Sequence, residues 1–214
     1  MKERPILFSA PMVQAILAGQ KTQTRRIIKP QPPAGTVSVG ILHPTTSPTY
    51  TWLQDDALVD NGQRCPYGQP GDRLYVRETW ARPTTLDPGP TIYRADYPAC
   101  VPSYYTNIPP EDEVVWKPSI HMPRSASRIT LEIINVRVER LHDISYEDAI
   151  AEGMPDASNA QPLPGPRVET LEQFARRTKF PQRSFFVMWD QLHGEGAREA
   201  DPWLWVVEFR RVQP

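Results

Sequence analysis

The chain has 214 residues, enough for one domain with elaborated loops and a genuine hydrophobic core. Its 24 Lys and Arg residues nearly balance its 25 Asp and Glu residues, and the net charge of -1 excludes the general basic excess that holds proteins on nucleic-acid backbones. Any contact with nucleic acid must therefore come from a local patch.

Compartment and redox state follow from what the sequence contains. It has no run of about 18 uncharged apolar residues, and it begins Met-Lys-Glu-Arg-Pro rather than with a hydrophobic signal segment. We therefore expect a cytoplasmic protein with no membrane partner. Cys65 and Cys100 are too few for a disulfide framework and lie in no Cys-x-x-Cys or Cys/His cluster, so we expect reduced thiols. The 25 prolines predict long loops.

The first 40 residues predict a strand, a short helix and a polar turn. Residues 5–9 have the character of a strand, and Pro11 opens a segment whose apolar positions recur at helical spacing as far as Gly19, a good helix stop. The polar run 20–26 follows at once, so we expect a turn or the start of a strand, at the surface or in a cleft. From residue 29 to about residue 40, prolines argue against regular structure.

The middle of the chain alternates between a strand, an irregular region and a second strand. A turn at Gly71-Asp72 precedes residues 73–80, which alternate as a half-buried strand does. Residues 81–127 are rich in proline and predict an irregular excursion. Residues 128–139 are β-rich and long, and we expect them to form a central strand of a barrel.

The last third predicts three helices and a closing strand. Ser145 followed by Asp148 resembles a helix cap, and Gly153 ends that helix, which places Glu152 at its C-terminal end. Residues 156–168 predict a polar linker, and 169–178 and 183–193 predict helices. In the final strand, residues 203–209, aromatic residues at every second position indicate a core strand: Trp203, Trp205 and Phe209.

These elements together predict the fold class. Strands scattered among short helices, without regular βαβ alternation and without a Gly-rich phosphate loop, indicate an α+β domain built on a small β-barrel. We expect a single domain over residues 1–214, with flanking short helices, an inserted proline-rich loop region at about 81–127 and a helical region at about 156–195.

One motif resembles a known family. Gly19, Lys21, Thr24 and Arg26 have the spacing of the Gly-x-Lys-x-x-Thr-x-Arg signature of the ASCH superfamily, a PUA-like fold. Within that superfamily the chain is similar to the bacterial N(4)-acetylcytidine amidohydrolases, which use a Lys and a Thr three residues apart and a distant Glu. The helix end at 151–154 resembles the short helix in which that Glu is followed two residues on by Met, which implies Glu152.

The resemblance implies a hydrolase that removes acyl groups from the exocyclic amine of cytosine nucleosides, with a small-molecule nucleoside as substrate and no cofactor. Thr24 would be the nucleophile and Lys21 its base, while Glu152 would orient Lys21 or relay a proton to the departing amine. Arg26 is implied as a substrate or oxyanion contact. The family enzymes are about half as long as this chain, and regions 81–127 and 156–195 lie outside the resemblance.

The chemistry of the residues agrees with these roles. A threonine hydroxyl is a weak nucleophile until a base removes its proton, and lysine serves as that base once desolvation lowers its pKa. Arg25 and Arg26 would disfavour a charged ammonium at Lys21, whereas Glu152 would favour it. The sequence therefore leaves the direction of the net pKa shift open.

Three further residues are candidates to face a nucleobase. Tyr75 and Trp80 offer rings for stacking, and the Glu78 carboxylate is able to accept from an exocyclic amine. A place in a core or surface strand is the simpler interpretation for two of the three. His121 is a weaker candidate for a substrate or metal contact, because four scattered histidines have no ligand spacing; we expect a structural or solvated role and no metal site.

Other interpretations stay open. A Lys-x-x-Thr sequence in a turn is usually only solvated. A non-catalytic RNA-binding ASCH module would use Arg25, Arg26 and Lys29 for phosphate contacts. A ribonuclease of the same fold would direct Lys21 and an arginine at the scissile phosphate. The sequence contains no signal for oligomeric state.

Overall fold

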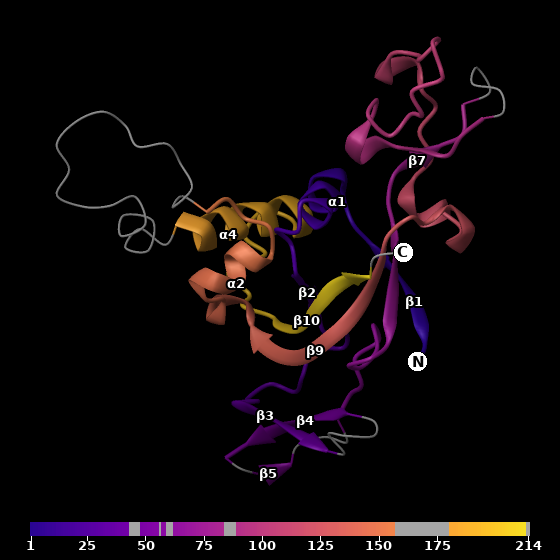
Figure 1. Ribbon diagram of the computed structural model, residues 1–214. Coiled ribbons are helices and arrows are strands. Elements are labelled where there is room, and N and C mark those ends of the chain that lie inside the picture. Colours follow the sequence, from indigo (N-terminus) through magenta and orange to yellow (C-terminus); the bar gives the residue numbers. More distant parts are fainter. Residues whose placement is uncertain (43–47, 56, 59–61, 84–88, 157–179, 213–214) are drawn as a thin grey trace, which may run out of the picture.

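A computed structural model describes residues 1–42, 48–55, 57–58, 62–83, 89–156 and 180–212 (Figure 1). Its centre is a five-stranded sheet in the order β1-β6-β9-β10-β2. The strands are β1 (Glu3–Leu7), β2 (Gln23–Ile27), β6 (Arg73–Arg77), β9 (Thr130–Arg140) and β10 (Trp203–Val212). β1 and β6 pair in parallel and the other neighbours are antiparallel. With its helices, the protein is a mixed α+β fold.

The long strands β9 and β10 form the middle of this sheet. The predicted strand 128–139 is confirmed as β9, the third of the five, although the described ladders leave β1 and β2 as edges rather than joining them into a closed barrel. A register shift between Glu208 and Phe209 interrupts the β9–β10 ladder. Figure 1 shows both strands bending strongly along their length.

The first half of β10, residues 203–207, is buried on both faces. Trp203, Trp205, Val207 and Phe209 alternate into the main hydrophobic core, as the period-two pattern predicts. Leu204, on the opposite face, belongs to a second core with Phe185 and Trp189 of the last helix. Residues 203–207 thus lie between two cores, which explains their continuous apolar sequence, whereas Arg210 and Arg211 beyond them are exposed.

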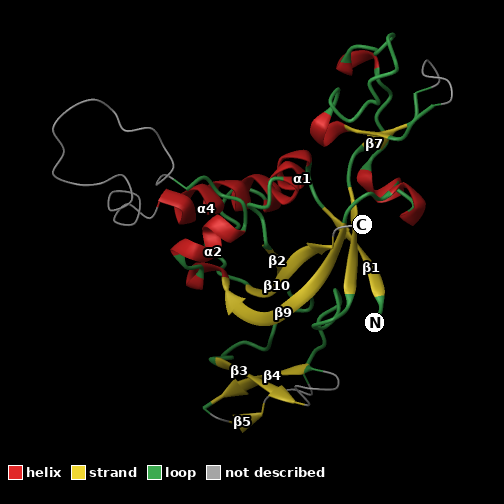
Figure 2. Cartoon of the chain, viewed as in Figure 1, coloured by secondary structure: helices red, strands yellow, loops and turns green. Residues whose placement is uncertain are grey.

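Three α-helices lie on one side of the sheet (Figure 2): α1 (Ala10–Leu17), α2 (Tyr146–Ala151) and α4 (Phe180–His193). α1 has Pro11 in its first turn, buries Val13 and Ile16, and is followed by Gly19 at φ +73°. The predicted cap of α2 is confirmed, because the Ser145 hydroxyl accepts a hydrogen bond from the backbone N–H of Asp148 at 2.9 Å.

Two physical reasons favour glycine at position 153, just beyond the end of α2. Its φ is +93°, a conformation that side chains disfavour. A Cβ there would also lie 3.1 Å from the Cβ of Ala15 in α1, so the small residue permits the two helices to approach. This close approach brings the C-terminal end of α2 against the turn that follows α1.

Two small structured regions extend from opposite ends of the central sheet (Figure 1). One is a three-stranded sheet of β3 (Ser38–Leu42), β4 (Thr49–Gln54) and β5 (Ala57–Leu58). The other belongs to the proline-rich region 81–127 and holds the hairpin of β7 (Trp80–Ala81) and β8 (Ile92–Tyr93). Four short 3₁₀ helices follow β8 among the described residues of this region. Its largely irregular path agrees with the sequence prediction.

Some predicted bounds are wrong. Regular structure begins at Ser38 within the stretch where prolines argued against it, because β3 pairs with β4 there. The first strand is Glu3–Leu7 rather than 5–9, and the last helix begins at Phe180 rather than residue 183. The predicted helix at 169–178, and the predicted linker beyond residue 156, lie outside the described residues.

Both Cys65 and Cys100 are free thiols, as predicted. Within the described ranges, no helix has the length and apolar character needed to cross a membrane.

Candidate active site

The centre of the candidate site is a buried ion pair between Lys21 and Glu152. The lysine Nζ donates to the Glu152 carboxylate oxygen Oε2 at 2.6 Å and to the Glu152 backbone carbonyl at 2.8 Å. Only 2% of Lys21 and 3% of Glu152 are exposed to solvent. The structure therefore brings together two of the three predicted catalytic residues, which are 131 positions apart in the sequence.

Local backbone contacts explain this meeting. After Gly19 reverses the chain, the backbone N–H of Lys21 donates to the Ala15 carbonyl, which keeps the turn against the end of α1. The next N–H, of Thr22, donates at 2.8 Å to the carbonyl of Ala151 in α2. The two helix ends are thus joined through the backbone, with Lys21 and Glu152 on the facing sides.

Arg25 is the second cation on the Glu152 carboxylate. Its guanidinium donates to Glu152 Oε1 at 3.4 Å, to Glu139 Oε2 at 2.8 Å and to Asp148 Oδ2 at 3.0 Å. Its side chain has no exposed surface. The Glu152 carboxylate is therefore shared between two cations, Lys21 on one oxygen and Arg25 on the other.

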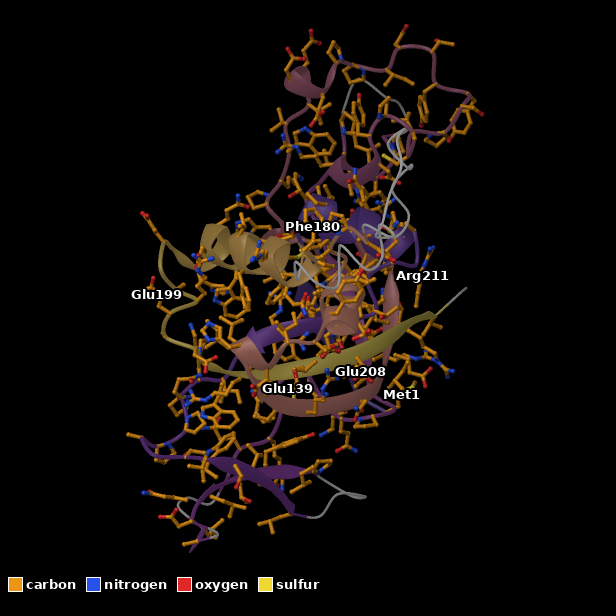
Figure 3. All side chains as sticks on the ribbon, turned by 90° about the vertical axis from the view of Figure 1, so that its left-hand side faces the viewer. Met1, Glu139, Phe180, Glu199, Glu208 and Arg211 are labelled. Carbon is orange, nitrogen blue, oxygen red and sulfur yellow. The ribbon has the colours of Figure 1, made fainter. Side chains whose placement is uncertain are left out.

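Arg137 extends the network toward solvent. It donates to Asp148 Oδ1 at 3.0 Å and also contacts Glu139 and Glu208. Figure 3 shows Glu139 and Glu208 on the neighbouring strands β9 and β10, where carboxylate oxygens gather. Two arginines and four carboxylates thus form a connected network, of which Glu152 is the member that binds Lys21.

Thr24 lies on the other face of β2. Gln23 and Arg25 both bond to Asp148, so the period-two alternation of a strand directs Thr24 and Arg26 to the opposite face. Thr24 is 3% exposed and pairs with Val207, a member of the main core. Within the described structure, no hydrogen bond joins its hydroxyl to Lys21 or Glu152. The described contacts therefore join Lys21 and Glu152 but not the third predicted catalytic residue, Thr24.

The Phe8 ring lies near both Lys21 and Arg26. The Lys21 Nζ is 5.7 Å from the centre of the Phe8 ring, and the Arg26 guanidinium carbon is 5.3 Å from it. Arg26 is half-buried and donates at 2.6 Å to the backbone carbonyl of Leu7. Lys21 and Arg26 therefore both lie near the Phe8 ring. Thr24 comes between them in the sequence and lies on the same face of β2 as Arg26.

Burial decides the direction of the Lys21 pKa. Loss of solvent lowers the pKa of the Lys21 amine below its usual 10.5, and the positive charges of Arg26 and Arg25 lower it further. The Glu152 carboxylate acts in the opposite direction, through its charge and its hydrogen bond, but the effect of burial is the larger. The sequence left the direction of the Lys21 pKa shift open. In the structure the pKa of Lys21 is lowered, which favours loss of the proton from its amine.

A cavity of about 340 Å³ adjoins the Glu152 side of the site. Its walls come from α1 and the residue before it, from the end of α2 and from the last turns of α4: Ser9, Pro11, Met12, Ala15, Glu152, Gly153, Met154, Met188, Gln191 and Leu192. The volume lies at the lower end of the range of about 300–1,000 Å³ typical of small-molecule sites. Glu152 therefore has its carboxylate in the ion-pair network and also forms part of a cavity wall.

Glu78 and Trp80 belong to a different cluster. Both carboxylate oxygens of Glu78 accept from Arg128 at 3.0 Å, and Arg128 also binds both oxygens of Asp96, at 2.6 and 2.9 Å. Trp80 is buried with Met122 and Ala126. Among the described residues, no hydrogen bond or ion pair links Glu78 or Trp80 to Lys21 or Glu152. The Glu78 carboxylate, expected to accept from a nucleobase, is already occupied by Arg128.

Tyr75 lies on β6 and is half-buried. The guanidinium carbon of Arg124 is 5.4 Å from the centre of its ring. Successive residues of a strand face opposite sides, so Tyr75 points away from the core residues Leu74 and Val76. The structure thus separates Tyr75 from the core face of β6.

Substitution of Arg128 by glutamine should destabilise the fold strongly. Glu78 is 1% exposed, and removal of one partner of a buried pair costs about 3–5 kcal/mol because the other charge stays buried alone. Burial already raises the pKa of Glu78 and Arg128 opposes that effect. Urea unfolding of Arg128→Gln measures the change. Arg94→Gln is the matched control, since Arg94 and its partner Glu111 have side chains 53% and 54% exposed, and it should cost at most about 1 kcal/mol. Equal losses in both variants would contradict this account.

His121 is exposed within a 3₁₀ helix, Ser119–His121, where its backbone N–H donates to the Pro118 carbonyl. No group of three His, Cys, Asp or Glu side chains suited to a metal ion occurs among the described residues.

Sequence reasoning missed the central role of Arg25. It named Arg25 as a perturbing charge and, in the RNA-binding interpretation, as a phosphate contact, but the side chain is enclosed by Glu139, Asp148 and Glu152. The available signal was the period-two relation of Gln23 and Arg25, which lie on either side of Thr24 in the sequence. That pattern could not name the three acidic partners, which come from β9 and α2.

No family model matches the sequence, and comparisons with curated proteins and with solved structures gave no significant match. The fold and the site thus define an α+β protein with a buried Lys–Glu–Arg network beside a cavity, and membership of a family stays a prediction.

Proposed function

We propose that this protein is an amidohydrolase of the ASCH type that removes an acyl group from the exocyclic N4 amine of a cytosine nucleoside. The observation that supports this most directly is the Lys21 amine, which is buried, has a lowered pKa and is held by Glu152. Thr24, three residues further on, is the hydroxyl that the signature assigns to the nucleophile. A neutral buried amine is the kind of base such a hydroxyl requires.

The reaction runs in two halves. The Thr24 hydroxyl attacks the acyl carbonyl carbon while neutral Lys21 takes its proton, and the tetrahedral intermediate collapses to a threonine ester as the cytosine amine departs with a proton. Water then attacks the ester, which releases the carboxylic acid and restores the hydroxyl. Arg26, half-buried on the same strand face as Thr24, is the candidate donor to the developing oxyanion. Glu152 orients Lys21 through its 2.6 Å contact.

The sheet is compatible with the PUA-like barrel that this proposal implies. Its central strands bend strongly (Figure 1), and the two short strands β1 and β2 occupy opposite edges of the five-stranded order. Curling of a sheet of this kind brings its edges toward each other. We therefore propose a small barrel-like core, with the 81–127 region and α4 as additions to it.

An RNA-binding module is the less favoured alternative. Its phosphate contacts were expected from Arg25, Arg26 and Lys29, yet the Arg25 side chain has no exposed surface and is neutralised by acidic partners. Phosphate binding requires accessible cations. Lys29 is exposed, but Arg26 is half-buried and bound to a backbone carbonyl. A ribonuclease would require Lys21 to reach a scissile phosphate despite its burial.

Incubation of the purified chain with N(4)-acetylcytidine tests the proposal. We expect a change in ultraviolet absorbance as cytidine forms, with acetate as the second product, and the same rate in the presence of a metal chelator. A matched incubation with cytidine alone should give no change. Absence of any turnover, together with retardation of structured RNA in a gel, would replace the proposal by the RNA-binding alternative.

A further inference from the structure

The cavity beside Glu152 is apolar over most of its wall. Methionines come from three elements, Met12 from α1, Met154 from the end of α2 and Met188 from α4, and Pro11, Ala15 and Leu192 add further apolar surface. Glu152 is the charged residue among the lining residues, and its carboxylate is bound to Lys21 and Arg25. Such a wall suits an uncharged aliphatic group, and the flexible thioether side chains adapt to groups of different length.

The sequence of α4 explains how this helix contributes to the wall. Phe185 and Trp189, four residues apart, are buried in the second core with Leu204. Met188 and Leu192 have the same spacing on a neighbouring face of the helix; Met188 is partly buried and packs against the second core, and Leu192 is 53% exposed. This second apolar stripe of α4 therefore runs from the edge of the second core to the mouth of the cavity.

The position of the cavity connects it with the proposed chemistry. Glu152 forms part of the wall and also accepts the Lys21 Nζ hydrogen bond at 2.6 Å. A substrate whose acyl carbonyl is presented to this pair would direct the rest of its acyl chain along Met154 and toward α4. The exocyclic amine and the base would remain on the other side of the carbonyl.

We infer that this cavity is an acyl-chain subsite and that the preferred substrates carry an uncharged aliphatic acyl group longer than acetyl, with hexanoyl as the representative. The inference rests on the proposed amidohydrolase function and specifies its substrate class. An acetyl group would leave most of the cavity unfilled. A dicarboxylic group such as succinyl would be rejected, because no cation among the described residues lines the cavity to receive its free carboxylate.

The size of the preference follows from the burial of methylene groups. Each buried methylene contributes about a fourfold gain in binding, and hexanoyl has four more than acetyl. We expect kcat/KM for N(4)-hexanoylcytidine to exceed that for N(4)-acetylcytidine by roughly 250-fold. N(4)-succinylcytidine should react more slowly than either.

Kinetics of the full chain with these three nucleosides test the inference. Met188→Trp should fill the cavity and reduce the hexanoyl-to-acetyl ratio of kcat/KM at least tenfold. Val187→Trp is the matched control. Val187 precedes Met188 in α4, but it is 54% exposed and is not among the residues that line the cavity. It should keep the wild-type ratio. Thermal unfolding of each variant verifies that the fold is retained.

A second variant keeps the test decisive if Met188→Trp does not fold. Leu192→Lys introduces a cation at the exposed mouth of the cavity, where a lysine side chain is easily accommodated. We expect it to lower kcat/KM for the hexanoyl substrate at least tenfold and to raise it for the succinyl substrate.

The outcomes separate the two proposals. Hydrolysis of acetylcytidine with equal or lower kcat/KM for the hexanoyl substrate overturns the subsite and leaves the amidohydrolase function standing. No hydrolysis of any of the three overturns both. A large hexanoyl preference that neither Met188→Trp nor Leu192→Lys alters, in folded protein, overturns the assignment of the acyl chain to this cavity.

Discussion

Thr24→Val should abolish deacylation while the protein remains folded. Valine has nearly the shape of threonine but lacks the hydroxyl, so the proposed nucleophile is removed with little change in volume. The substitution also suits its surroundings, because Thr24 is 3% exposed, lies on a strand and is paired with Val207. We expect kcat for N(4)-acetylcytidine to fall at least about 1,000-fold.

The control for this prediction is Thr24→Ser, which keeps a hydroxyl at the same position. It should retain measurable turnover, although the freer serine side chain reduces the rate. Circular dichroism melting of both variants tests whether the fold is intact. If Thr24→Val deacylates the substrate as fast as the wild type, Thr24 is not the nucleophile and the proposed reaction sequence is wrong.

Local sequence signals predicted the elements that position the site. Pro11 and Gly19 bound α1, and the Ser145 cap with Gly153 bounds α2, because capping and positive φ are decided by a few neighbouring residues. These signals placed Glu152 at the end of α2, where the structure has it. The strand order could not be read in the same way, since the β1–β6 and β10–β2 pairings join distant segments.

Two residues of the site were predictable, but its electrostatics were not. The family resemblance named Lys21 and Glu152, and they form an ion pair. The lowered pKa of Lys21 depends first on its complete burial and then on the positive charges of Arg26 and Arg25. This burial arises where the end of α2 meets the turn after α1. The ion pair of Glu78 was unpredictable for a related reason. Its partner Arg128 comes 50 positions later, and no local pattern announces that pairing.

Lys21→Met should remove the pH dependence that the proposed base imposes. The neutral form of Lys21 accepts the proton, so in the wild type kcat/KM should rise with pH until the amine is deprotonated. Because burial lowers the pKa of Lys21, the midpoint of this rise should lie below 10.5. Methionine has a similar length and no titrating group. We expect the variant to lack the rise and to be about 100- to 10,000-fold slower.

Arg25 provides the sharpest control for this account, as a residue that positions Glu152 without contacting the substrate. Arg25→Gln removes a positive charge near Lys21 and leaves the Glu152 carboxylate to the lysine alone. Both effects favour the ammonium form, so the pKa of Lys21 should rise and the rate profile should move to higher pH. Below the midpoint, the rate should then fall about tenfold for each pH unit of displacement.

Arg25→Lys separates this electrostatic role from a structural one. It keeps the positive charge beside Glu152, so its pH–rate profile should lie close to that of the wild type, although it cannot reproduce all three contacts of the guanidinium. A merely structural role would lower the plateau rate in both variants and leave the midpoint unmoved. A midpoint in Arg25→Gln that coincides with the wild-type value would therefore show that the shared carboxylate does not control Lys21.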